Sequence, residues 1–599
     1  MTYDRSLWLK SYDPGVGPEV QIEHDSLPAC FEYIRRQRGD KPAVHYLGVT
    51  FTFDQLLGHA DRFARCLADH GIGKGDAVAI CLPNSPQYLI ALIGALKAGA
   101  AASGLSPLHS AKEMAYQLKD SGAKAFVVMD AIFEHRFMGV ADQAPDLQLV
   151  VPTGLLDFLP KIKQLLAKWL KKVPTGRTLP VPGKTVVPLM EVLSRFPAQP
   201  PDVGLTRDDP CFIQYTGGTT GLPKGALCVH RNMLTNVKQW LDWLQVDDNQ
   251  DQTILSAFPM FHIAGLFTAL CGLTFGLPQV VIPNPRDTKL IVREIAKYRP
   301  QWLANVPSLY LMLLQEPGFH KLDFSDLLFC ISGAAPFSVE GIKQFENVVG
   351  EGKVIEVYGM TETCVLVTAN PRLGTKKIGS VGLPLPSTKV KIVDLASGEQ
   401  EVPLGEVGEI IATGPQIMRE YHNRPGETSQ VMRMHDGEVW MHTGDLGTMD
   451  EDGYVTIVDR AKDMISVSGY KVFPREVEEK LYEHPAIDLC AVIGVQNPER
   501  PETEMVKLVV QKSAAYQDKA DGEVSKDIIA FSRENFASYK VPKIIEYREI
   551  PLTPAGKVDK KALKYKDNCS HARLESDGHP ELTCLVDLTE RWKGTHELR

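Results

Sequence analysis

Through the first two thirds of the chain, short apolar runs alternate with segments of helical pattern. Ala77–Leu82 and Ala123–Val128 have the apolar content of buried strands, and Pro86–Ala98 between them has the length and composition of a helix. Ile254–Phe258 and Val280–Ile282 continue the series of strands. Because strands that alternate with helices form sheets covered by those helices, this order predicts an α/β fold with layered, largely parallel sheets.

The later part of the chain changes character. Gly374–Thr413 is rich in Val, Ile, Gly and Pro, which predicts a small β-rich subdomain. A strand-like segment, Tyr454–Val458, then gives way to a charged connector, Asp459–Asp463, where we place a domain boundary. A smaller α+β domain follows, and beyond Leu563 the pattern is lost, which is typical of a flexible tail. The expected divisions are a large N-terminal domain, a smaller C-terminal domain and a tail, at residues 1–460, 461–568 and 569–599.

Length, charge and cysteine usage indicate a large soluble enzyme. The 599 residues suit about two to four domains, and a net charge of −9 argues against nucleic acid as a partner. The 11 cysteines form no Cys-x-x-Cys pair or Cys/His cluster, so we expect reduced thiols and no zinc site. Met1–Tyr12 lacks the apolar core of a signal peptide, and the apolar stretch Tyr88–Ala102 is too short to span a bilayer. These observations predict a cytoplasmic location.

Residues 215–226 form a loop of glycines, hydroxyls and one lysine, Tyr-Thr-Gly-Gly-Thr-Thr-Gly-Leu-Pro-Lys-Gly-Ala. The glycines let backbone N–H groups approach a polyanion, the threonines add hydroxyl donors, and Lys224 adds a positive charge. A Walker A loop requires Ser or Thr after its lysine, whereas Gly225 follows Lys224, which disfavours P-loop phosphoryl transfer. By itself the segment fits either a phosphate-binding loop or a surface loop of turn-forming residues.

This loop resembles the signature of the adenylate-forming (AMP-binding) superfamily, which includes acyl-CoA synthetases, nonribosomal peptide adenylation domains and luciferases. Further segments resemble the superfamily's other motifs and follow its order, namely Ser332–Pro336, Tyr358–Thr363, Thr443–Asp445, Asp459–Asp463 and Gly556-Lys557. The resemblance covers roughly residues 25–568. The chain is most similar to bacterial long-chain fatty-acyl-CoA synthetases, at Leu255–Leu266, Asn284–Asp287, Gly379–Ser387 and Ser468–Pro474.

The resemblance implies a site for ATP. The glycine-rich loop would hold the β- and γ-phosphates, Glu362 with Thr219 would bind Mg²⁺, and Asp445 would accept hydrogen bonds from the ribose hydroxyls. Tyr358 would stack on the adenine beside a turn of small residues, and Arg460 would reach a ribose or phosphate oxygen. The implied nucleotide-binding residues are Thr216, Gly217, Gly218, Thr219, Thr220, Gly221, Lys224, Gly333, Ala334, Ala335, Tyr358, Gly359, Met360, Thr361, Asp445 and Arg460.

The resemblance also implies a catalytic lysine, Lys557, which would bridge the acyl carboxylate and the α-phosphate of ATP. The implied catalytic set is Lys557, Lys224, Glu362 and His262. Lys471 resembles a residue that reaches the active site only after the C-terminal domain has rotated, and Gly469 would let the pantetheine arm of CoA pass. Lys462 is the implied hinge, so the C-terminal domain is expected to be mobile.

Pro259–Leu266 resembles the wall of the family's acyl pocket, with His262 near the carboxylate and Phe261 and Leu266 beside the acyl chain. An alternative interpretation of His262 is a hydrogen-bonded core histidine. No charged residue falls among the matched positions. An aliphatic or aryl acid is therefore favoured over an amino acid, whose ammonium group would need a carboxylate partner.

Together these features imply an AMP-forming acyl-CoA synthetase that activates a medium- to long-chain fatty acid with ATP, Mg²⁺ and CoA. Two enzyme alternatives are an acyl-AMP ligase that loads a carrier protein and a CoA ligase for aryl or other carboxylic acids. A further alternative is a fatty-acid capture protein with a vestigial site. The intact Lys224, Glu362, Asp445 and Lys557 argue against this last interpretation.

Leu155–Val173 places apolar residues at helical spacing beside five lysines, which predicts a basic amphipathic helix. The apolar face either packs on the protein or lies on an anionic membrane, and both alternatives stay open. The lysines are Lys161, Lys163, Lys168, Lys171 and Lys172. The expected partners are fatty acid, ATP and CoA, without nucleic acid. Peripheral contact with the inner face of the membrane and a homodimer are left open.

Overall fold

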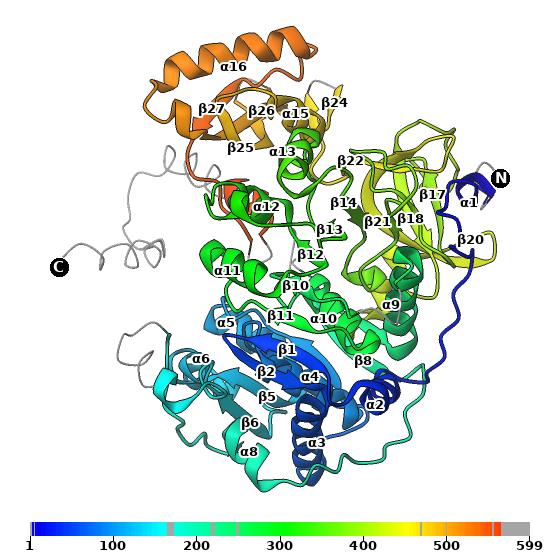
Figure 1. Ribbon diagram of the computed structural model, residues 1–599. Coiled ribbons are helices and arrows are strands. Elements are labelled where there is room, and N and C mark those ends of the chain that lie inside the picture. The colour runs from blue at the N-terminus through cyan, green and yellow to red at the C-terminus, as the bar shows by residue number, and fades with distance from the viewer. Residues whose placement is uncertain are drawn as a thin grey trace.

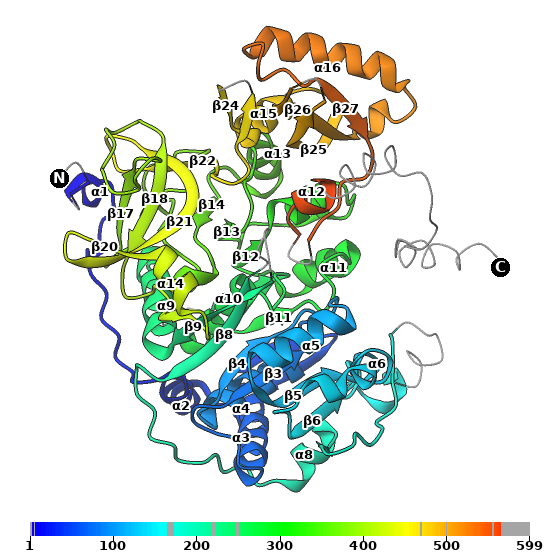
Figure 2. The same ribbon diagram turned by 180° about the vertical axis from the view of Figure 1, so that it is seen from behind.

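The computed structural model describes residues 3–4, 6–164, 173–216, 222–246, 251–467, 470–498, 500–553 and 556–564. Figure 1 shows two α/β layers stacked in the lower and middle parts of the molecule, a β-rich unit at their side and the C-terminal unit above. The reverse view in Figure 2 has the same arrangement. The fold class expected from the alternation of strands and helices is confirmed.

The first large sheet runs in the order β19-β9-β8-β4-β3-β5-β6-β7. Its central strands β3 to β6 pair in parallel, whereas β8 and β9 form an antiparallel pair on either side of the glycine-rich loop. The bounds are β3 Ala77–Cys81, β4 Ala101–Gly104, β5 Ala123–Met129, β6 Leu149–Thr153, β7 Thr185–Val186, β8 Pro210–Thr216, β9 Lys224–Val229 and β19 Glu420–Tyr421. The antiparallel pair therefore positions both ends of that loop at one edge of the sheet.

The second large sheet runs in the order β16-β15-β14-β13-β12-β10-β11-β1-β2. Strands β10 to β14 and β1 pair in parallel, so that their carboxyl ends lie at the same edge. The bounds are β1 Pro42–Tyr46, β2 Val49–Thr52, β10 Ile254–Ser256, β11 Gln279–Val281, β12 Trp302–Asn305, β13 Phe329–Ser332, β14 Val354–Tyr358, β15 Thr368–Ala369 and β16 Leu383–Pro384.

The β-rich unit is an antiparallel sheet in the order β17-β18-β21-β20, with β22 also paired to β21. Its strands are β17 Lys389–Val393, β18 Gly408–Thr413, β20 Met432–His435, β21 Glu438–Met449 and β22 Val455–Arg460. Strands β17 and β18 lie within the expected subdomain at Gly374–Thr413, but β20 to β22 follow it, and β16 joins the second large sheet instead. Local composition identifies strands but not the sheet in which they pair, which explains the difference.

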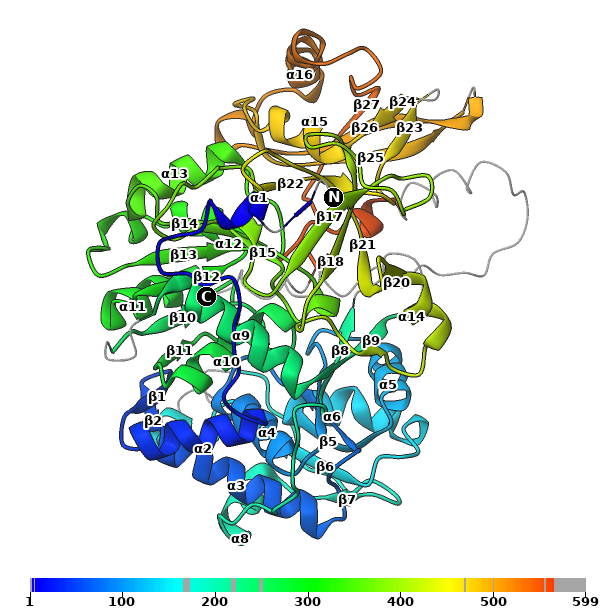
Figure 3. The same ribbon diagram turned by 90° about the vertical axis from the view of Figure 1, so that its right-hand side faces the viewer.

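The C-terminal unit contains a hairpin, β23 with β24, and a second sheet in the order β25-β26-β27. Its strands are β23 Ile465–Val467, β24 Tyr470–Val472, β25 Ile487–Asn497, β26 Arg500–Lys512 and β27 Ile544–Tyr547. Its buried side chains form clusters separate from the large core of the rest of the chain. The side view in Figure 3 shows this unit seated above strands of the second large sheet and the β-rich unit.

The helices cover the sheets and separate them. In chain order they are α1 Ser6–Leu9, α2 Leu27–Arg38, α3 Phe53–Asp69, α4 Pro86–Lys97, α5 Ala111–Asp120, α6 Asp130–His135, α8 Leu189–Arg195, α9 His230–Leu244, α10 Ile263–Phe275, α11 Thr288–Tyr298, α12 Pro307–Leu314, α13 Val339–Val349, α14 Pro425–Val431, α15 Pro474–Leu481 and α16 Asp521–Asn535. Short 3₁₀ turns are η1 Phe137–Gly139, η2 Ala141–Gln143, η3 Phe319–Lys321, η4 Thr361–Thr363 and η5 Ala514–Tyr516. None of the helices in the described ranges is long and apolar enough to cross a bilayer.

Helix α4 shows why such a hydrophobic segment is a core helix. Ser85 caps its N-terminus by accepting a hydrogen bond from the Tyr88 amide, and a proline stands in its first turn. Every residue of the helix is buried, which is typical of a helix that is apolar all round. The ammonium group of its one cation, Lys97, contacts the carboxylates of Glu32 and Asp61, so that its charge is compensated within the core.

The segment that begins at Leu155 differs from the expected helix over 155–173. Residues 155–159 form turns, in which the Asp157 carboxylate accepts hydrogen bonds from Thr153 and the Gly154 amide, and Leu159 is buried. Helix starts only after Pro160, at residues 161–164. Residues 165–172, including Lys168, Lys171 and Lys172, lie outside the described residues, as does the predicted tail from 569 onward.

The N-terminal segment crosses the β-rich unit and holds it against the rest of the chain. Trp8 is fully buried against Gly453, in the turn before β22. Tyr12 donates a hydrogen bond to the Pro384 carbonyl and packs edge-on against Trp243 of α9. The segment thereby connects elements that are distant in sequence.

Candidate active site

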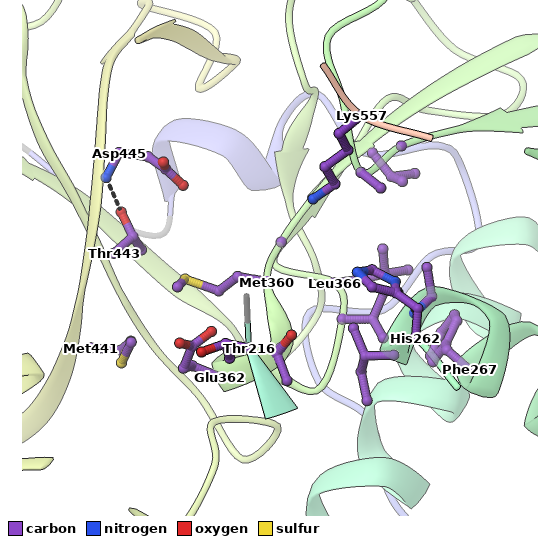
Figure 4. A pocket seen from close by; sticks show the side chains of 18 of the residues that line it. Thr216, His262, Phe267, Met360, Glu362, Leu366, Met441, Thr443, Asp445 and Lys557 are labelled. Atoms are coloured by element: carbon purple, nitrogen blue, oxygen red, sulfur yellow. Dashed lines mark hydrogen bonds between the residues drawn. The ribbon is translucent and has the colours of Figure 1, made fainter. Parts of the chain in front are cut away.

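A cavity of about 420 Å³ lies between the second large sheet and the β-rich unit. Residues at the carboxyl ends of β13 and β14 line one side, β21 and β22 contribute the opposite side, and helix α10 lies alongside. The carboxyl ends of parallel strands are the usual ligand-binding edge of an α/β fold. In Figure 4, Lys557 extends into the cavity from above, Asp445 lies on one side, and His262 and Phe267 lie on the other.

Most of the predicted site residues within the described ranges line this cavity. They are Thr216, Lys224, His262, Gly333, Ala334, Gly359, Met360, Thr361, Glu362, Asp445, Arg460, Lys462 and Lys557. Five that do not are Ala335, Tyr358, Phe261, Leu266 and Lys471. Gly217, Gly218, Thr219, Thr220, Gly221 and Gly469 lie outside the described residues.

Asp445 is presented to the cavity by an irregularity between β18 and β21. Its carboxylate accepts a hydrogen bond of 2.8 Å from the Tyr358 hydroxyl and pairs with Nε of Arg460 at 3.0 Å. Both partners are donors, and an ionised carboxylate can only accept hydrogen bonds. The arrangement suits recognition of a vicinal diol such as ribose. Tyr358, expected to stack on adenine, orients this carboxylate through its hydroxyl and is not among the residues that line the cavity.

Small residues line the part of the cavity beside Asp445. A Cβ atom added to Gly359 would lie only 1.5 Å from the carbonyl oxygen of Val365, so no larger residue fits at this position. Ala334 follows Gly333 with a left-handed φ of 66°. Backbone surfaces of this kind leave room for a flat ring, as an adenine would require.

Glu362 stands on the 3₁₀ turn η4, which follows β14. The Tyr421 hydroxyl donates a 2.6 Å hydrogen bond to one oxygen of its carboxylate. Burial raises the pKa of Glu362, although the hydrogen bond from Tyr421 opposes this shift. A buried carboxylate at a cavity wall, with one oxygen bonded to a hydroxyl, is a fitting ligand for a divalent cation.

The donor set around Glu362 fits Mg²⁺ shared with a substrate. Among the described residues, no cluster of three or more His, Cys, Asp or Glu could hold a metal alone. Magnesium is commonly held by one or two carboxylates together with substrate phosphates and water, rather than by a protein cage. One carboxylate in a cavity that Thr216 and Lys224 also line is compatible with this requirement.

Lys224 begins β9 and lies opposite Thr216 across the base of the glycine-rich loop. Its ammonium group is 2.5 Å from the Glu427 carboxylate and lies over the ring of Tyr421, 4.9 Å from the centroid. Tyr421 thus contacts both Lys224 and Glu362. The segment from β19 into α14 therefore connects the cation of the loop with the carboxylate of the candidate metal site.

The base of the loop is also held from helix α5. Tyr215 donates a 2.8 Å hydrogen bond to Asp120, and Tyr116 donates one of the same length to the carbonyl of Pro223. Arg424 pairs with the second oxygen of Asp120 at 2.8 Å. Sequence reasoning missed these residues, as it missed Tyr421 and Glu427, because polar side chains in helical or turn segments carry no local signal that separates them from ordinary surface charge.

Lys557 reaches the cavity on a loop of the C-terminal unit. A turn closed by hydrogen bonds with Thr553 shapes this loop, and the Ser308 hydroxyl donates a 2.9 Å hydrogen bond to the Gly556 carbonyl. Burial lowers the pKa of Lys557 to about 8, with Arg460 acting in the same direction. Burial likewise lowers the pKa of Lys462, which also lines the cavity. The cavity is therefore rich in cations and suited to an anion.

His262 caps the N-terminus of α10, where its ring accepts a hydrogen bond from the Ala264 amide. Burial lowers its pKa to about 3, with Lys557 contributing, so the imidazole is neutral at physiological pH. The helix presents Ile263, Phe267 and Cys271 to the cavity, at helical spacing.

Phe261 and Leu266, expected to lie beside the acyl chain, are not among the residues that line the cavity. Leu266 lies on a different face of α10 and packs in the core, while the Phe261 carbonyl accepts a hydrogen bond from Gln214. The lining contributed by α9, α10, β12 and β13 contains no charged side chain. It consists of Trp240, Ile263, Ala264, Phe267, Thr268, Cys271, Trp302 and Ile331.

Lys471, expected to act in thioester formation, lies on β24, exposed and away from the cavity lining. Lys557 and Lys471 belong to the same unit but do not reach the cavity together. One orientation of this unit therefore brings only one of these lysines to the site.

Comparison with known proteins agrees with this geometry. The sequence model of the AMP-binding enzyme family matches residues 31–422, and that of the AMP-binding enzyme C-terminal domain matches residues 476–557. The chain is 35% identical over 580 residues to a long-chain-fatty-acid–CoA ligase of Bacillus subtilis, covering 94% of this chain and 98% of the relative. A ligase of the same name from Salmonella typhimurium is 35% identical over 573 residues, with the same coverage.

Among solved structures, ATP-bound MatB from Rhodopseudomonas palustris matches with a TM-score of 0.74 and 26% identity, covering 90% of this chain and 99% of that chain.

Proposed function

The chain belongs to the AMP-binding enzyme family, and from this premise we propose that it is an AMP-forming long-chain fatty-acid–CoA ligase. As an adenylate-forming CoA ligase it uses ATP, Mg²⁺ and CoA. The observation that carries the choice of acid is a single cavity that joins a cluster of charged residues to an apolar wall without charge. The near full-length similarity to ligases named for long-chain fatty acids supports the same choice.

In the first proposed step, a carboxylate oxygen of the fatty acid attacks the α-phosphorus of ATP, and pyrophosphate leaves. Both reactants are anions, so catalysis requires positive charge and alignment. Lys557 bridges the attacking carboxylate and the α-phosphate, and Lys224 neutralises the departing phosphates. Asp445 accepts hydrogen bonds from the ribose hydroxyls. Arg460 pairs with Asp445 and also contacts an oxygen of the nucleotide.

The neutral His262 acts in positioning rather than in proton transfer. In Figure 4 it lies between Phe267 and Lys557, and we propose that the acyl carboxylate meets the phosphate beside it. Glu362 holds the magnesium ion, which supplies charge neutralisation for the phosphates when bound. Tyr421 keeps the Glu362 carboxylate in place through its 2.6 Å hydrogen bond.

In the second proposed step, the thiol of CoA attacks the acyl-adenylate and AMP leaves. We propose that the chain divides into residues 1–460 and 461–568, and that the second domain rotates about Lys462. This rotation withdraws Lys557 and brings Lys471 and Gly469 to the cavity. Its support is that Lys471 is exposed on the same unit whose Lys557 now occupies the site.

The apolar wall selects the acid. Two tryptophans, Trp240 and Trp302, with Phe267 and Ile331, offer surface to a hydrocarbon chain, and burying each methylene contributes about 0.8 kcal/mol. A substrate ammonium or second carboxylate would lie there unpaired, which is costly. An aryl acid is the closest competitor, since a flat ring is also apolar.

The test is acid-dependent release of AMP with and without CoA, over straight-chain acids of increasing length and over aromatic acids. We expect turnover with long straight chains that requires CoA, and acyl-CoA as product. A preference for aromatic acids would favour the aryl-CoA alternative. Acyl-adenylate that accumulates and is not consumed by CoA would favour an acyl-AMP ligase that loads a carrier protein.

We further propose a cytoplasmic enzyme that touches the inner face of the membrane through residues 155–173. Support comes from Lys161 and Lys163, which are exposed on either side of Ile162, itself 81% exposed. Each lysine near an anionic surface contributes about 1 kcal/mol to membrane binding.

We also propose that the enzyme assembles as a homodimer, which analytical sedimentation would test.

The membrane proposal is tested by vesicle co-sedimentation of a variant in which the five lysines of residues 155–173 are replaced by Gln. It should lose binding to anionic vesicles but keep activity on a soluble acid. A control with Lys343→Gln and Lys526→Gln, two exposed lysines elsewhere, should still bind. If the wild type ignores anionic vesicles, the segment has no lipid role.

A further inference from the structure

The turn that carries Asp445 is an irregular bulge in the β-rich sheet. Glu409 of β18 lies opposite Leu446 of β21, but Ile411, only two residues further, lies opposite His442. Three residues of β21, Thr443 to Asp445, therefore face a single residue of β18. Bulges of this kind re-aim a side chain and are frequent next to active sites.

Gly444 sets the shape of this bulge. Its φ of 70° lies in the left-handed region, and a Cβ atom there would meet nothing within 4 Å. The preference for glycine is therefore conformational rather than steric. A left-handed residue in a bulge leaves its amide outside the ladder, so it needs a partner of its own.

Both backbone groups of Gly444 and the Asp445 amide have such partners. Thr443 donates its hydroxyl to the Ile410 carbonyl at 2.7 Å and accepts from the Asp445 amide at 3.1 Å. The Gly444 carbonyl accepts a 3.0 Å hydrogen bond from the Ala461 amide, next to the proposed hinge. The Gly444 amide donates at 3.0 Å to one carboxylate oxygen of Glu409.

The second oxygen of Glu409 is also used. It lies 2.9 Å from Nδ1 of His442, whose Nε2 is 2.8 Å from Nε2 of His435. Because the carboxylate can only accept, His442 donates through Nδ1. Burial alone would raise the pKa of Glu409, but the hydrogen bonds from His442 and Gly444 outweigh it and hold the pKa below its ordinary value.

From this geometry, and on the basis of the function proposed above, we infer that Glu409 is a positioning residue for nucleotide binding. It holds the Gly444 amide, and thereby fixes the direction in which Asp445 faces the cavity. His442, which lines the cavity, keeps the Glu409 carboxylate from turning away. Glu409 itself does not line the cavity and so acts through its neighbours.

The bulge also touches the connection between the two proposed domains. Ala461 lies between Arg460, which pairs with Asp445, and Lys462. A displaced Gly444 would therefore shift both the ribose-binding carboxylate and the start of the hinge. We expect the loss of Glu409 to weaken nucleotide binding more than it slows the attack of CoA on preformed acyl-AMP.

The test compares Glu409→Ala with Glu409→Gln. Gln keeps an oxygen acceptor for the Gly444 amide, whereas Ala removes it. We expect Glu409→Ala to raise the Kd for AMP about tenfold and the KM for ATP by a similar factor, with a much smaller change in kcat. Glu409→Gln should restore most of this affinity. If the Ala variant does not fold, Glu409→Asp, whose side chain is too short to reach both partners, serves in its place.

A readout independent of activity is hydrogen exchange of the peptide that contains residues 443–446. Exchange there should accelerate in Glu409→Ala and stay near the wild-type rate in Glu409→Gln. Glu438→Ala is the matched control, since Glu438 stands in the same sheet but pairs with Lys389 at the surface. It should match wild type in both affinity and exchange.

Unchanged AMP affinity and exchange in Glu409→Ala would overturn the inference, and so would a Gln variant as impaired as the Ala variant. A wild type that binds AMP but activates no fatty acid would instead contradict the proposed function. The two failures are therefore distinguishable.

Discussion

At the scale of single residues, the cavity contains charged side chains in positions where burial disfavours the charge. Lys557 is half-buried, and its pKa is lowered to about 8 by burial and by Arg460. Asp445 and Glu362 oppose this shift. The ammonium group of such a lysine would be stabilised by a bound carboxylate and a bound phosphate. The substrates of adenylation would supply both of these anions.

Replacing Lys557 with Ala should abolish formation of acyl-adenylate, with a loss of at least about a hundredfold in kcat/KM, because a charge that acts only in the transition state is removed. Attack of CoA on preformed acyl-AMP should be nearly unchanged. The two half-reactions are measured separately, with Lys561→Ala, an exposed neighbour, as control. Equal losses in both half-reactions would contradict the assignment.

The pH profile should report the same lysine. The ammonium form is required, so kcat/KM for adenylation should fall as pH rises through about 8, where the free enzyme loses this proton. Bound anions favour the ammonium, so the corresponding limb of kcat should lie at higher pH. Lys557→Arg, which stays protonated, should lack the limb if it retains activity. A wild-type kcat/KM that stays constant from roughly pH 7 to roughly pH 10 would contradict the assignment of this limb to Lys557.

At the scale of elements, segments distant in sequence build the site together. Strands β8 and β9, on either side of the glycine-rich segment, belong to the first large sheet. Lys224 contacts β19 and α14, and Asp445 belongs to the β-rich sheet. The N-terminal segment with α1 holds that last sheet in place. Stability of this contact is therefore a condition for a well-formed cavity.

Trp8→Ala should destabilise the protein by about 3–5 kcal/mol, because it removes a fully buried aromatic side chain and leaves a cavity against Gly453. The melting temperature of the first unfolding transition is the measurement, since a multidomain chain need not unfold in one step. Leu108→Ala, at a side chain that is 66% exposed, should change it by less than about 0.5 kcal/mol. Equal melting of Trp8→Ala and wild type would show that the segment is not anchored.

At the scale of the whole molecule, a buried carboxylate lies where the C-terminal unit meets the second large sheet. Glu356 of β14 accepts a hydrogen bond from the Gly379 amide, and the charges near it include Arg475 and Glu479 of α15. Burial raises the pKa of Glu356 to about 7, against the opposing effects of Gly379 and Arg475. The contact between the two units is therefore sensitive to pH.

The folded protein binds a proton at Glu356 more tightly than the unfolded chain, so this stabilisation is complete below the unfolded pKa of 4.5 and is lost as pH rises through about 7. The difference between the folded and unfolded pKa values of Glu356 corresponds to about 3 kcal/mol in the free energy of unfolding. The melting temperature of Glu356→Gln should therefore equal that of wild type at about pH 5, which is close to the unfolded pKa. At about pH 8 it should exceed that of wild type. Glu351→Gln, at an exposed position, should show no such difference. Parallel melting curves at both pH values would contradict the prediction.

The sequence by itself determined the α/β class and identified most of the charged residues that line the cavity. Alternating strands and helices are local patterns, and loops such as Tyr358–Thr363 or Thr443–Asp445 carry their chemistry within a few consecutive residues. Such segments can be interpreted one at a time. Their occurrence in the order of a known superfamily then indicated the reaction.

Only the tertiary structure decided how distant side chains meet. It placed Phe267 and Cys271, rather than Phe261 and Leu266, on the cavity wall, because the face that a helix turns to a cavity depends on what packs behind it. It turned the Tyr358 hydroxyl toward Asp445. It also brought Glu409 to the Gly444 amide, 35 residues away, by pairing β18 with β21. Contacts made by pairing and packing over such separations have no local signal in the sequence.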